Sequence, residues 1–260
     1  MYFYPMNEPL ILLSPSKGMS TELADVRVSA AKPQFPGVTK AVVNAVKSLN
    51  DVEAKKRFKV SDKMWPDVEE LWKPSGSEFV SPSHGIQGLY AYNGEAFKFL
   101  DAQNLSEKAK GKSIQQLVVL SALYGVVEAN SCIRPYRLEM QMKLEVGDHK
   151  SLYALWKPKL TKWLNEHKSG FIIDACSGEY SKAVDWKHIE KPVVQVDFKQ
   201  LKNGQMKSVS AFSKQARGAF ARWVLEHDIH TISDLYTFDE MGYELHSNND
   251  NKLVFLRDSQ

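Results

Sequence analysis

The sequence predicts a single α/β (mixed α+β) domain in which helices flank a mixed β-sheet. Three short runs are wholly apolar, as expected for strands buried on both faces: residues 10–13, 117–120 and 171–173. Longer segments between these runs carry apolar residues at helical spacing. With 260 residues, 43% of them hydrophobic and 25% charged, the chain can bury a sizeable core. We therefore expect one domain over residues 1–260, although this length also allows two small domains.

A mainly helical region is expected at about residues 38–112. Apolar residues recur at helical spacing over residues 38–59, and a second helix is expected over 61–73. Two helices around a short join can form a helix-hairpin-helix, which binds DNA phosphates through backbone amides. The join lacks the usual glycine, so ordinary packing of the two helices is the favoured interpretation. Further along, residues 96–105 are expected to be helical and 108–112 to form a basic turn.

The second half of the chain is expected to combine helices with β-hairpins. Residues 152–167 are amphipathic and predict a helix whose tryptophans pack in the core. Alternating apolar residues before an Asn203-Gly204 turn predict a β-hairpin near residues 193–212. A helix capped by Ser213 follows, and a closing hairpin is expected over residues 235–257.

Composition and charge argue against several functional classes. The two cysteines, Cys132 and Cys176, are too few for a disulfide framework or a cysteine metal site. The histidines form no ligand pattern such as HExxH, so neither a metal nor a cofactor is expected. The amino terminus lacks a signal-peptide pattern, and no apolar run approaches the ~18 residues that span a bilayer. We therefore expect a cytoplasmic protein without membrane contact.

Each of the three apolar runs ends in a polar loop: residues 14–18 (SPSKG), 121–125 (SALYG) and 176–182 (CSGEYSK). In α/β sheets, ligands bind outside the carboxyl ends of the strands. If the three strands are parallel neighbours, their loops line one crevice. This favours a functional role for the cations, tyrosines and carboxylate of the loops: Lys17, Tyr124, Glu179, Tyr180 and Lys182. Taken alone, the first loop is an ordinary polar turn without Walker A spacing.

A second group of chemically active residues lies at positions 134–139. Arg134, Tyr136, Arg137 and Glu139 crowd around a proline in this stretch. Each guanidinium presents a fixed fork of donors that matches carboxylate or phosphate oxygens. Two interpretations explain why these residues occur together: an anion-binding site, or a structural ion pair such as Arg137 with Glu139.

Positive charge is concentrated between residues 198 and 225. This segment holds six basic residues and no acidic one, whereas the whole chain carries only +3. On its helix, Lys214, Arg217 and Arg222 surround small residues on the face opposite the expected core. Small residues let a partner's backbone approach, and a local positive field attracts phosphates. A polyanion such as nucleic acid is therefore favoured over a merely solvated basic face.

Several of these segments together resemble the bacterial YaaA peroxide-stress family. They follow the family's order from Leu10 onward and read LSPSKGM, LSALYGV, RPYRLEM, CSGEYSKAV, SKQARGAFARWVLE, GYEL and LVF. The sequence departs from the family pattern by nine additional residues at the amino terminus and by Ser16, where alanine is usual. It also lacks the hairpin glycine, and it has residues 127–129 (VEA) where Arg-Pro is more usual.

The resemblance implies a cytosolic protein that protects cells from hydrogen peroxide by limiting damage linked to free iron. It also implies a mixed α/β domain with a positively charged cleft that binds duplex or branched DNA. The family pattern carries over onto twelve positions of this chain: Lys17, Tyr124, Arg134, Tyr136, Arg137, Glu139, Glu179, Tyr180, Lys182, Lys214, Arg217 and Arg222.

Two functions from different classes follow. The first is DNA binding, with these lysines and arginines and Tyr136 on the phosphates. The second is an enzyme that acts on a small phosphorylated or carboxylated substrate. Its catalytic candidates are Glu139, Glu179, Tyr124 and Tyr180, which handle protons while the cations hold the anion. A deep, closed pocket favours the enzyme and a long open groove favours DNA. The oligomeric state and the substrate stay open.

Overall fold

The computed structural model of the chain describes residues 8–22, 24–25, 31–80 and 84–258. Its strands are β1 (Pro9–Leu13), β2 (Ala24–Asp25), β3 (His84–Gln87), β4 (Leu117–Ser121), β5 (Gly125–Glu128), β6 (Cys132–Ile133), β7 (Phe171–Asp174), β8 (Val193–Lys202), β9 (Gln205–Lys207), β10 (Glu244–Asn249) and β11 (Lys252–Asp258). Within the described residues, eight strands form one sheet in the order β10-β11-β8-β7-β1-β4-β5, with β9 paired to β8. A small second sheet contains β2, β3 and β6.

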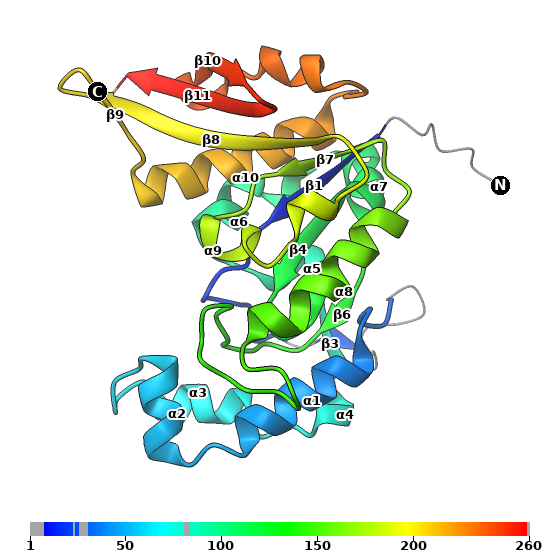
Figure 1. The fold of residues 1–260 in the computed structure, drawn as a ribbon, viewed down its shortest axis with the longest axis vertical. Helices are drawn as coiled ribbons and strands as arrows, with labels where there is room; N and C mark the ends of the chain where they lie inside the picture. The colour runs from blue at the N-terminus through cyan, green and yellow to red at the C-terminus, as the bar shows by residue number, and fades with distance from the viewer. Residues whose placement is uncertain (1–7, 23, 26–30, 81–83, 259–260) are drawn as a thin grey trace.

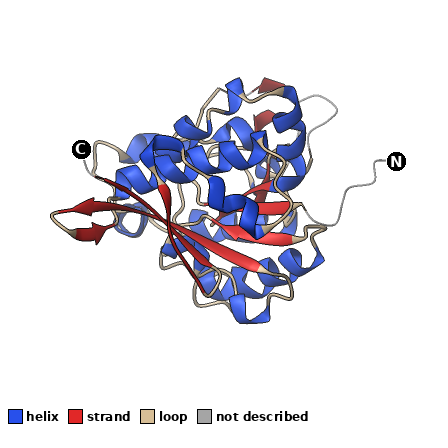
Figure 2. Ribbon diagram, turned by 90° about the horizontal axis from the view of Figure 1, so that it is seen from above, coloured by secondary structure: helices blue, strands red, loops and turns tan. Residues whose placement is uncertain are grey.

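The large sheet is mixed, with a parallel centre. β4, β1, β7, β8 and β11 are parallel neighbours, and β5, β9 and β10 pair antiparallel at the margins. The strands β1, β4 and β7 are buried along their whole length, as their apolar runs predict. Helices lie on both sides of the sheet in Figure 2, so the predicted mixed α/β class is confirmed.

The helices divide into a sheet-covering set and a separate group at one end. They are α1 (Pro36–Lys47), α2 (Asp51–Phe58), α3 (Trp65–Leu71), α4 (Gly76–Phe79), α5 (Gly88–Ala91), α6 (Glu95–Leu100), α7 (Glu107–Gln116), α8 (Leu152–Glu166), α9 (Gly178–Ser181) and α10 (Ser210–Glu226). Short 3-10 helices lie at Ala102–Asn104, Trp186–His188, Ile232–Thr237 and Glu240–Gly242. α10 contacts β8, α6 and α7. α1 to α4 lie together at the end remote from β8 and β11 (Figure 1).

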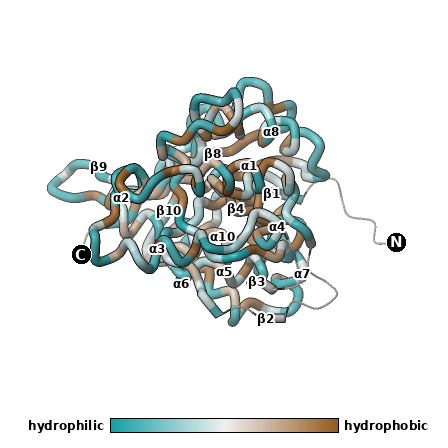
Figure 3. Tube along the Cα trace, turned by 90° about the horizontal axis from the view of Figure 1, so that it is seen from below, coloured by the Kyte–Doolittle hydropathy of each residue, from teal (hydrophilic) through white to brown (hydrophobic). Residues whose placement is uncertain are grey.

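An aromatic cluster fixes α10 to the sheet. Phe198 of β8 stacks on Phe255 of β11, with ring centroids 5.4 Å apart. Phe220 of α10 meets Phe198 edge-on at 5.7 Å, and all three rings are fully buried. Figure 3 shows the same division, with brown, hydrophobic segments inside and teal, hydrophilic loops outside, including the tip beside β9. The helix that carries Lys214 and Arg217 is therefore held rigidly on the sheet.

The helical region differs from the prediction in two places. Residues 38–59 form two helices, because Asn50 begins α2 by accepting a hydrogen bond from the Glu53 N–H (3.0 Å). Residues 108–112 are not a turn but part of α7, which Ser106 caps by accepting from the Ala109 N–H (3.1 Å). The basic composition of residues 108–112 fits an exposed helix as well as a turn, so it could not distinguish the two.

The hairpin near residues 193–212 is present, but its return strand is shorter than predicted. β8 alternates more and less buried side chains, and Asn203 and Gly204 form the turn with φ of 51° and 70°. β9 consists of three exposed residues and has no apolar face to bury, so pairing ends at Lys207. α10 then begins at Ser210. Ser213 is thus not its cap, and the buried Ser213 hydroxyl donates to the Phe198 carbonyl (3.0 Å).

The topology brings the three polar loops to one edge of the sheet. β7, β1 and β4 are adjacent, and Leu12 lies opposite both Asp174 and Val118. β1 and β7 end within one residue of each other in this register and β4 continues two residues further, so the segments that follow leave the sheet at one edge. Sequence reasoning predicted this shared edge from the three apolar runs, but only the loops after β1 and β7 line a cavity there, whereas residues 121–125 do not.

Candidate functional site

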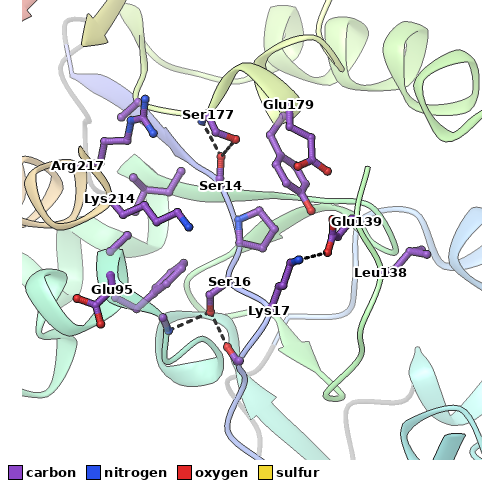
Figure 4. A pocket seen from close by; sticks show the side chains of 18 of the residues that line it. Ser14, Ser16, Lys17, Glu95, Leu138, Glu139, Ser177, Glu179, Lys214 and Arg217 are labelled. Atoms are coloured by element: carbon purple, nitrogen blue, oxygen red, sulfur yellow. Dashed lines mark hydrogen bonds and ion pairs between the residues drawn. The ribbon is translucent and has the colours of Figure 1, made fainter. Parts of the chain in front are cut away.

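A cavity of about 410 Å³, the central pocket, opens at the carboxyl ends of β1 and β7 (Figure 4). Five segments that are distant in sequence form its wall. The lining residues are Leu13, Ser14, Pro15, Ser16, Lys17, Gly18, Gly94, Glu95, Ala96, Phe97, Tyr136, Arg137, Leu138, Glu139, Ala175, Ser177, Glu179, Tyr180, Lys214 and Arg217. Cavities of this size in proteins accommodate small molecules.

Two serines join the loops that follow β1 and β7. The Ser14 hydroxyl donates to the Ser177 hydroxyl (3.1 Å) and accepts from the Ser177 N–H (2.8 Å). Below them, the buried Asp174 accepts from the Ser181 hydroxyl (2.6 Å) and the Cys176 N–H (3.0 Å). These bonds fix the floor of the central pocket at the point where the two parallel strands end.

Another part of the pocket wall depends on the close approach of two turns, one at Ser16 and one at Gly94. The Ser16 hydroxyl accepts from the Gly94 N–H (3.0 Å), and the Asn93 N–H donates to the Gly18 carbonyl (3.2 Å). A Cβ atom at position 94 would lie 2.4 Å from the Ser16 Cβ, which is closer than side chains tolerate. Glycine at position 94 therefore lets the loop that carries Lys17 pack directly on the start of α6.

α10 supplies the cations on one side of the central pocket. Lys214 and Arg217 both line it, and the Arg217 Nε is buried without a hydrogen-bond partner among the described residues. The Arg137 Nε, on another segment of the lining, is in the same condition. Burial raises the pKa of Asp174, and the nearby charge of Arg217 opposes part of that rise. Two arginine groups thus have donor capacity that the protein itself leaves unused.

The small residues of α10 pack against α6 and not against an external partner. A Cβ at Gly218 would lie 1.8 Å from the Ala96 carbonyl oxygen, and Ala221 is fully buried. Gln215 of α10 also donates to the Glu95 carboxylate (2.8 Å). The interpretation of this face as a surface for a partner's backbone is therefore wrong, because the chain's own helix occupies it.

Two carboxylates line the other side of the central pocket, and their pKa values shift in opposite directions. Burial works to raise the pKa of Glu139, but hydrogen bonds from Lys17 and Gln141 outweigh it and lower the pKa. The Lys17 Nζ lies 2.5 Å from the Glu139 Oε1. Burial raises the pKa of Glu179, and the charge of Glu139 adds to the rise despite a hydrogen bond from the Gln141 N–H. Such divergence is typical of groups that divide acid and base roles.

The tyrosines form a buried group behind these carboxylates. Burial raises the pKa of Tyr136 to about 12, and its hydroxyl bonds the hydroxyls of Ser121 (2.7 Å) and Tyr92 (3.1 Å). Burial also raises the pKa of Tyr180 well above its usual value. Tyr124 does not reach the pocket, because its buried hydroxyl accepts from the Arg134 N–H (3.0 Å). These phenols remain protonated at neutral pH, so they act as hydrogen-bond donors rather than bases.

Comparison with known proteins identifies the family. The family model described as peroxide stress protein YaaA matches residues 10–249. The chain belongs to the YaaA peroxide-stress family. A UPF0246 protein of Maricaulis maris is 34% identical over 255 residues, which is 95% of this chain and 95% of the relative. Similar UPF0246 proteins occur in Flavobacterium johnsoniae (32% identical, 95% and 99% covered) and Idiomarina loihiensis (33% identical, 96% and 99% covered).

Of the twelve positions that the YaaA resemblance carries over, eight line the central pocket: Lys17, Tyr136, Arg137, Glu139, Glu179, Tyr180, Lys214 and Arg217. Four positions lie elsewhere. Tyr124 and Arg134 meet behind the pocket, as described above, and Lys182 is exposed just after α9. Arg222 forms an ion pair with Asp101 (2.8 Å) and donates to the Asn104 carbonyl, so it ties α10 to the end of α6.

Some lining residues of this YaaA-family pocket were not predicted. Phe97 had no motif of its own, and the turn at Gly94 gave no functional signal in the sequence. Ser14 and Ser177 were detectable only as hydroxyls within the polar loops that follow two buried strands. The contribution of residues 94–97 depends on how α6 packs against the first loop, which neither periodicity nor composition specifies.

A second, more open hollow of about 870 Å³ adjoins the central pocket and shares Arg137 and Glu139 with it. We call it the α2 groove; its cations are Lys56, Arg57, Lys59, Arg137, Lys143 and Lys150. Its acids are Glu53, Glu139 and Glu145. Arg57 forms an ion pair with Glu53, and Lys150 forms one with Glu145. Lys56, Lys59 and Lys143 are exposed and form no ion pair within the described residues.

Other chemistry is little represented in the described part of the YaaA-family chain. Cys132 and Cys176 are buried, and burial raises the pKa of both thiols. No three His, Cys, Asp or Glu side chains of residues 8–22, 24–25, 31–80 and 84–258 gather as a metal site would require. In the same residues, no helix combines the length and apolar character of a membrane-crossing segment.

Proposed function

We propose that this peroxide-stress protein is an enzyme that acts on a small phosphorylated or carboxylated molecule in the central pocket. The observation that carries the proposal is the convergence of two under-used guanidiniums and two carboxylates of opposite pKa shift on one small cavity. A duplex cannot enter a cavity of about 410 Å³, whereas a metabolite-sized anion can.

The arginines and lysines of the pocket supply the anion site. A buried guanidinium Nε without a partner is destabilising unless a ligand oxygen accepts its hydrogen bond. Arg137 and Arg217 can each provide such a bond, and Lys214 adds a positive charge on the same wall as Arg217 (Figure 4). Bonds between charged donors and phosphate or carboxylate oxygens are the stronger class of hydrogen bond.

The carboxylates supply proton transfer. Burial raises the pKa of Glu179 above its ordinary value, and its position on the pocket wall gives it access to a bound molecule. Glu139 stays ionised beside Lys17 and keeps a fixed negative charge near Glu179. We assign Glu179 the proton-transfer role and Glu139 the role of tuning it.

Ligand-induced stabilisation tests the anion site. Thermal unfolding of the wild-type protein is followed with increasing inorganic phosphate and citrate, in parallel with Arg217→Gln and with Lys182→Gln as a matched control. Lys182 is an exposed cation outside the pocket, so its loss removes the same charge without touching the site. We expect Arg217→Gln to weaken anion binding by roughly tenfold or more, the effect of one charged hydrogen bond. Equal losses in both variants would indicate only nonspecific charge attraction and refute the proposal.

A second function, DNA binding, is favoured by the α2 groove. We propose that the exposed Lys56, Lys59 and Lys143 contact phosphates of duplex or branched DNA, with Arg137 at the entrance to the pocket. The wider basic segment of residues 198–225 gives less support. Its side chains diverge, because Lys214 and Arg217 turn into the pocket while Arg222 pairs with Asp101. In the cytoplasm, this binding would protect DNA from iron-linked oxidative damage.

Salt-dependent titration tests the second function. Each phosphate contact contributes about 0.9 to the slope of log K against log salt for duplex DNA. The combined Lys56→Gln, Lys59→Gln and Lys143→Gln variant should therefore lower the slope by about 3. Titration uses a duplex and a four-way junction, with Lys168→Gln, an exposed lysine just before β7, as the control. An unchanged slope in the triple variant would remove the α2 groove from the proposal.

A further inference from the structure

The central pocket has cations on one side and an unpaired carboxylate on the other. Figure 4 shows Lys214 and Arg217 on one side of the cavity and Glu179 on the other, with Ser14 between them. Glu139 lies beside Glu179 but is paired with Lys17, and Glu95 lies on the side of Lys214 but binds Gln215 and Lys98. The apolar part of the lining includes the buried Leu13, Phe97, Leu138 and Ala175 together with Pro15. A ligand that fills the cavity therefore contacts cations, an unpaired carboxylate and apolar side chains at the same time.

Glu179 is the carboxylate of this side that no ion pair neutralises within the described residues. Lys17 pairs with Glu139, and no side chain of the described residues forms an ion pair with Glu179. The Glu179 carboxylate accepts the Gln141 N–H (3.2 Å), which leaves further acceptor capacity toward the pocket. A ligand group that reaches Glu179 therefore meets a hydrogen-bond acceptor without an ion-pair partner, which favours a donor at this position.

The middle of the pocket suits a flat or aliphatic body. Phe97 is nearly buried, and one of its faces is covered by Tyr92 at 4.9 Å between ring centroids. Tyr92 is in turn held by Tyr136 through their hydroxyls. The apolar wall is therefore preorganised, since its aromatic members support one another and cannot turn away when a ligand enters.

We infer that the ligand of the central pocket is bipolar. It carries a phosphate or carboxylate that binds Lys214 and Arg217, and an amine or amino-bearing ring that donates hydrogen bonds to Glu179. This inference rests on the proposed small-anion function and narrows its substrate class. It disfavours compounds that are anionic throughout, such as polyphosphates, because their far end has no hydrogen to donate to Glu179.

Two matched trios of compounds test this inference by titration calorimetry and thermal unfolding. The first trio is adenosine monophosphate, its anionic half ribose 5-phosphate and its donor half adenosine. The second is phosphoethanolamine, ethyl phosphate and ethanolamine, which spans a shorter distance. With the wild-type protein, the bipolar member of at least one trio should bind at least tenfold more tightly than its anionic half.

Two variants then test which side chain binds each end of the ligand. Glu179→Gln should weaken binding of the bipolar compound by roughly tenfold and leave binding of its anionic half unchanged, whereas Arg217→Gln should weaken binding of both. If the anionic half binds as tightly as the bipolar compound and Glu179→Gln changes neither, the bipolar inference is wrong and the small-anion function stands. If no member of either trio binds at millimolar concentration, both are wrong. The wild-type comparison decides the inference even where a variant does not fold.

Discussion

Replacing Gly218 by alanine tests how the central pocket is assembled. The added Cβ would lie 1.8 Å from the Ala96 carbonyl oxygen, whereas real Cβ atoms keep at least 3.0 Å. α6 and α10 must therefore separate by roughly 1.2 Å or distort. The opposing atom belongs to the backbone, so no flexible side chain can move aside. Both helices line the pocket, through Glu95 to Phe97 on α6 and through Lys214 and Arg217 on α10.

The expected change in the free energy of unfolding is the sum of two opposing contributions. Overpacking of a close helix contact costs about 3 kcal/mol, at the upper end of the usual range, because the clash is with backbone. Alanine gains about 1 kcal/mol over glycine in helix propensity. We therefore expect Gly218→Ala to lower the free energy of unfolding by about 2 kcal/mol, which corresponds to a decrease of about 4–8 °C in Tm. Anion binding should weaken as well, because Arg217 is displaced from its position on the pocket wall.

Gly111 provides the matched control. It also lies within a helix, α7, but a Cβ there meets nothing within 4 Å. Gly111→Ala should raise the free energy of unfolding by about 1 kcal/mol and leave anion binding unchanged. Urea unfolding at equilibrium measures both variants. The reasoning fails if Gly218→Ala is as stable as the wild type, or if the two alanine variants shift stability in the same direction.

Three further predictions concern single groups. The pKa of Glu179 is higher in the folded than in the unfolded state, so the folded protein loses stability as pH rises above the ordinary glutamate pKa. The Tm of Glu179→Gln should therefore increase relative to that of the wild type over this pH range. A Tm difference that does not change with pH would contradict this prediction. Arg222→Gln should lower stability by no more than about 1 kcal/mol, since its ion pair with Asp101 is partly exposed, and should leave anion binding at wild-type strength in calorimetry. Cys132 and Cys176 should react with a chromogenic disulfide only as fast as the protein unfolds, and immediate labelling under native conditions would show that burial does not protect them.

The sheet and its functional edge were predictable because they depend on short-range patterns. Wholly apolar runs predict strands buried on both faces, and parallel neighbours deliver their following loops to one edge. Lys17 and Glu179 reached the candidate site by this reasoning alone. The same logic could not separate Tyr124 from Tyr180, since both tyrosines lie in polar loops that follow buried strands. Tyr124 is turned into the core by its bond with the Arg134 N–H, a contact ten residues along the chain.

The helical faces were harder to predict, because a helix with two buried faces gives the same periodicity as one with a binding face. Gly218 and Ala221 were consistent with close approach of a partner, and that approach does occur, but with Ala96 of the same chain. Arg222 has the same ambiguity, since a cation on such a face serves equally for a phosphate or for Asp101. Tertiary contacts decided both cases, and these join residues about 120 positions apart.

The two proposed functions are not independent, because the central pocket and the α2 groove share Arg137 and Glu139. An anion bound in the pocket uses the unpartnered Nε of Arg137 and reduces the positive field at the entrance to the groove. DNA and a small anion should therefore weaken each other's binding by the same factor, as linkage requires. Titration of duplex DNA with and without saturating phosphate measures this coupling at constant ionic strength. Independent binding would separate the two sites and place the DNA contacts beyond Arg137, on Lys56, Lys59 and Lys143.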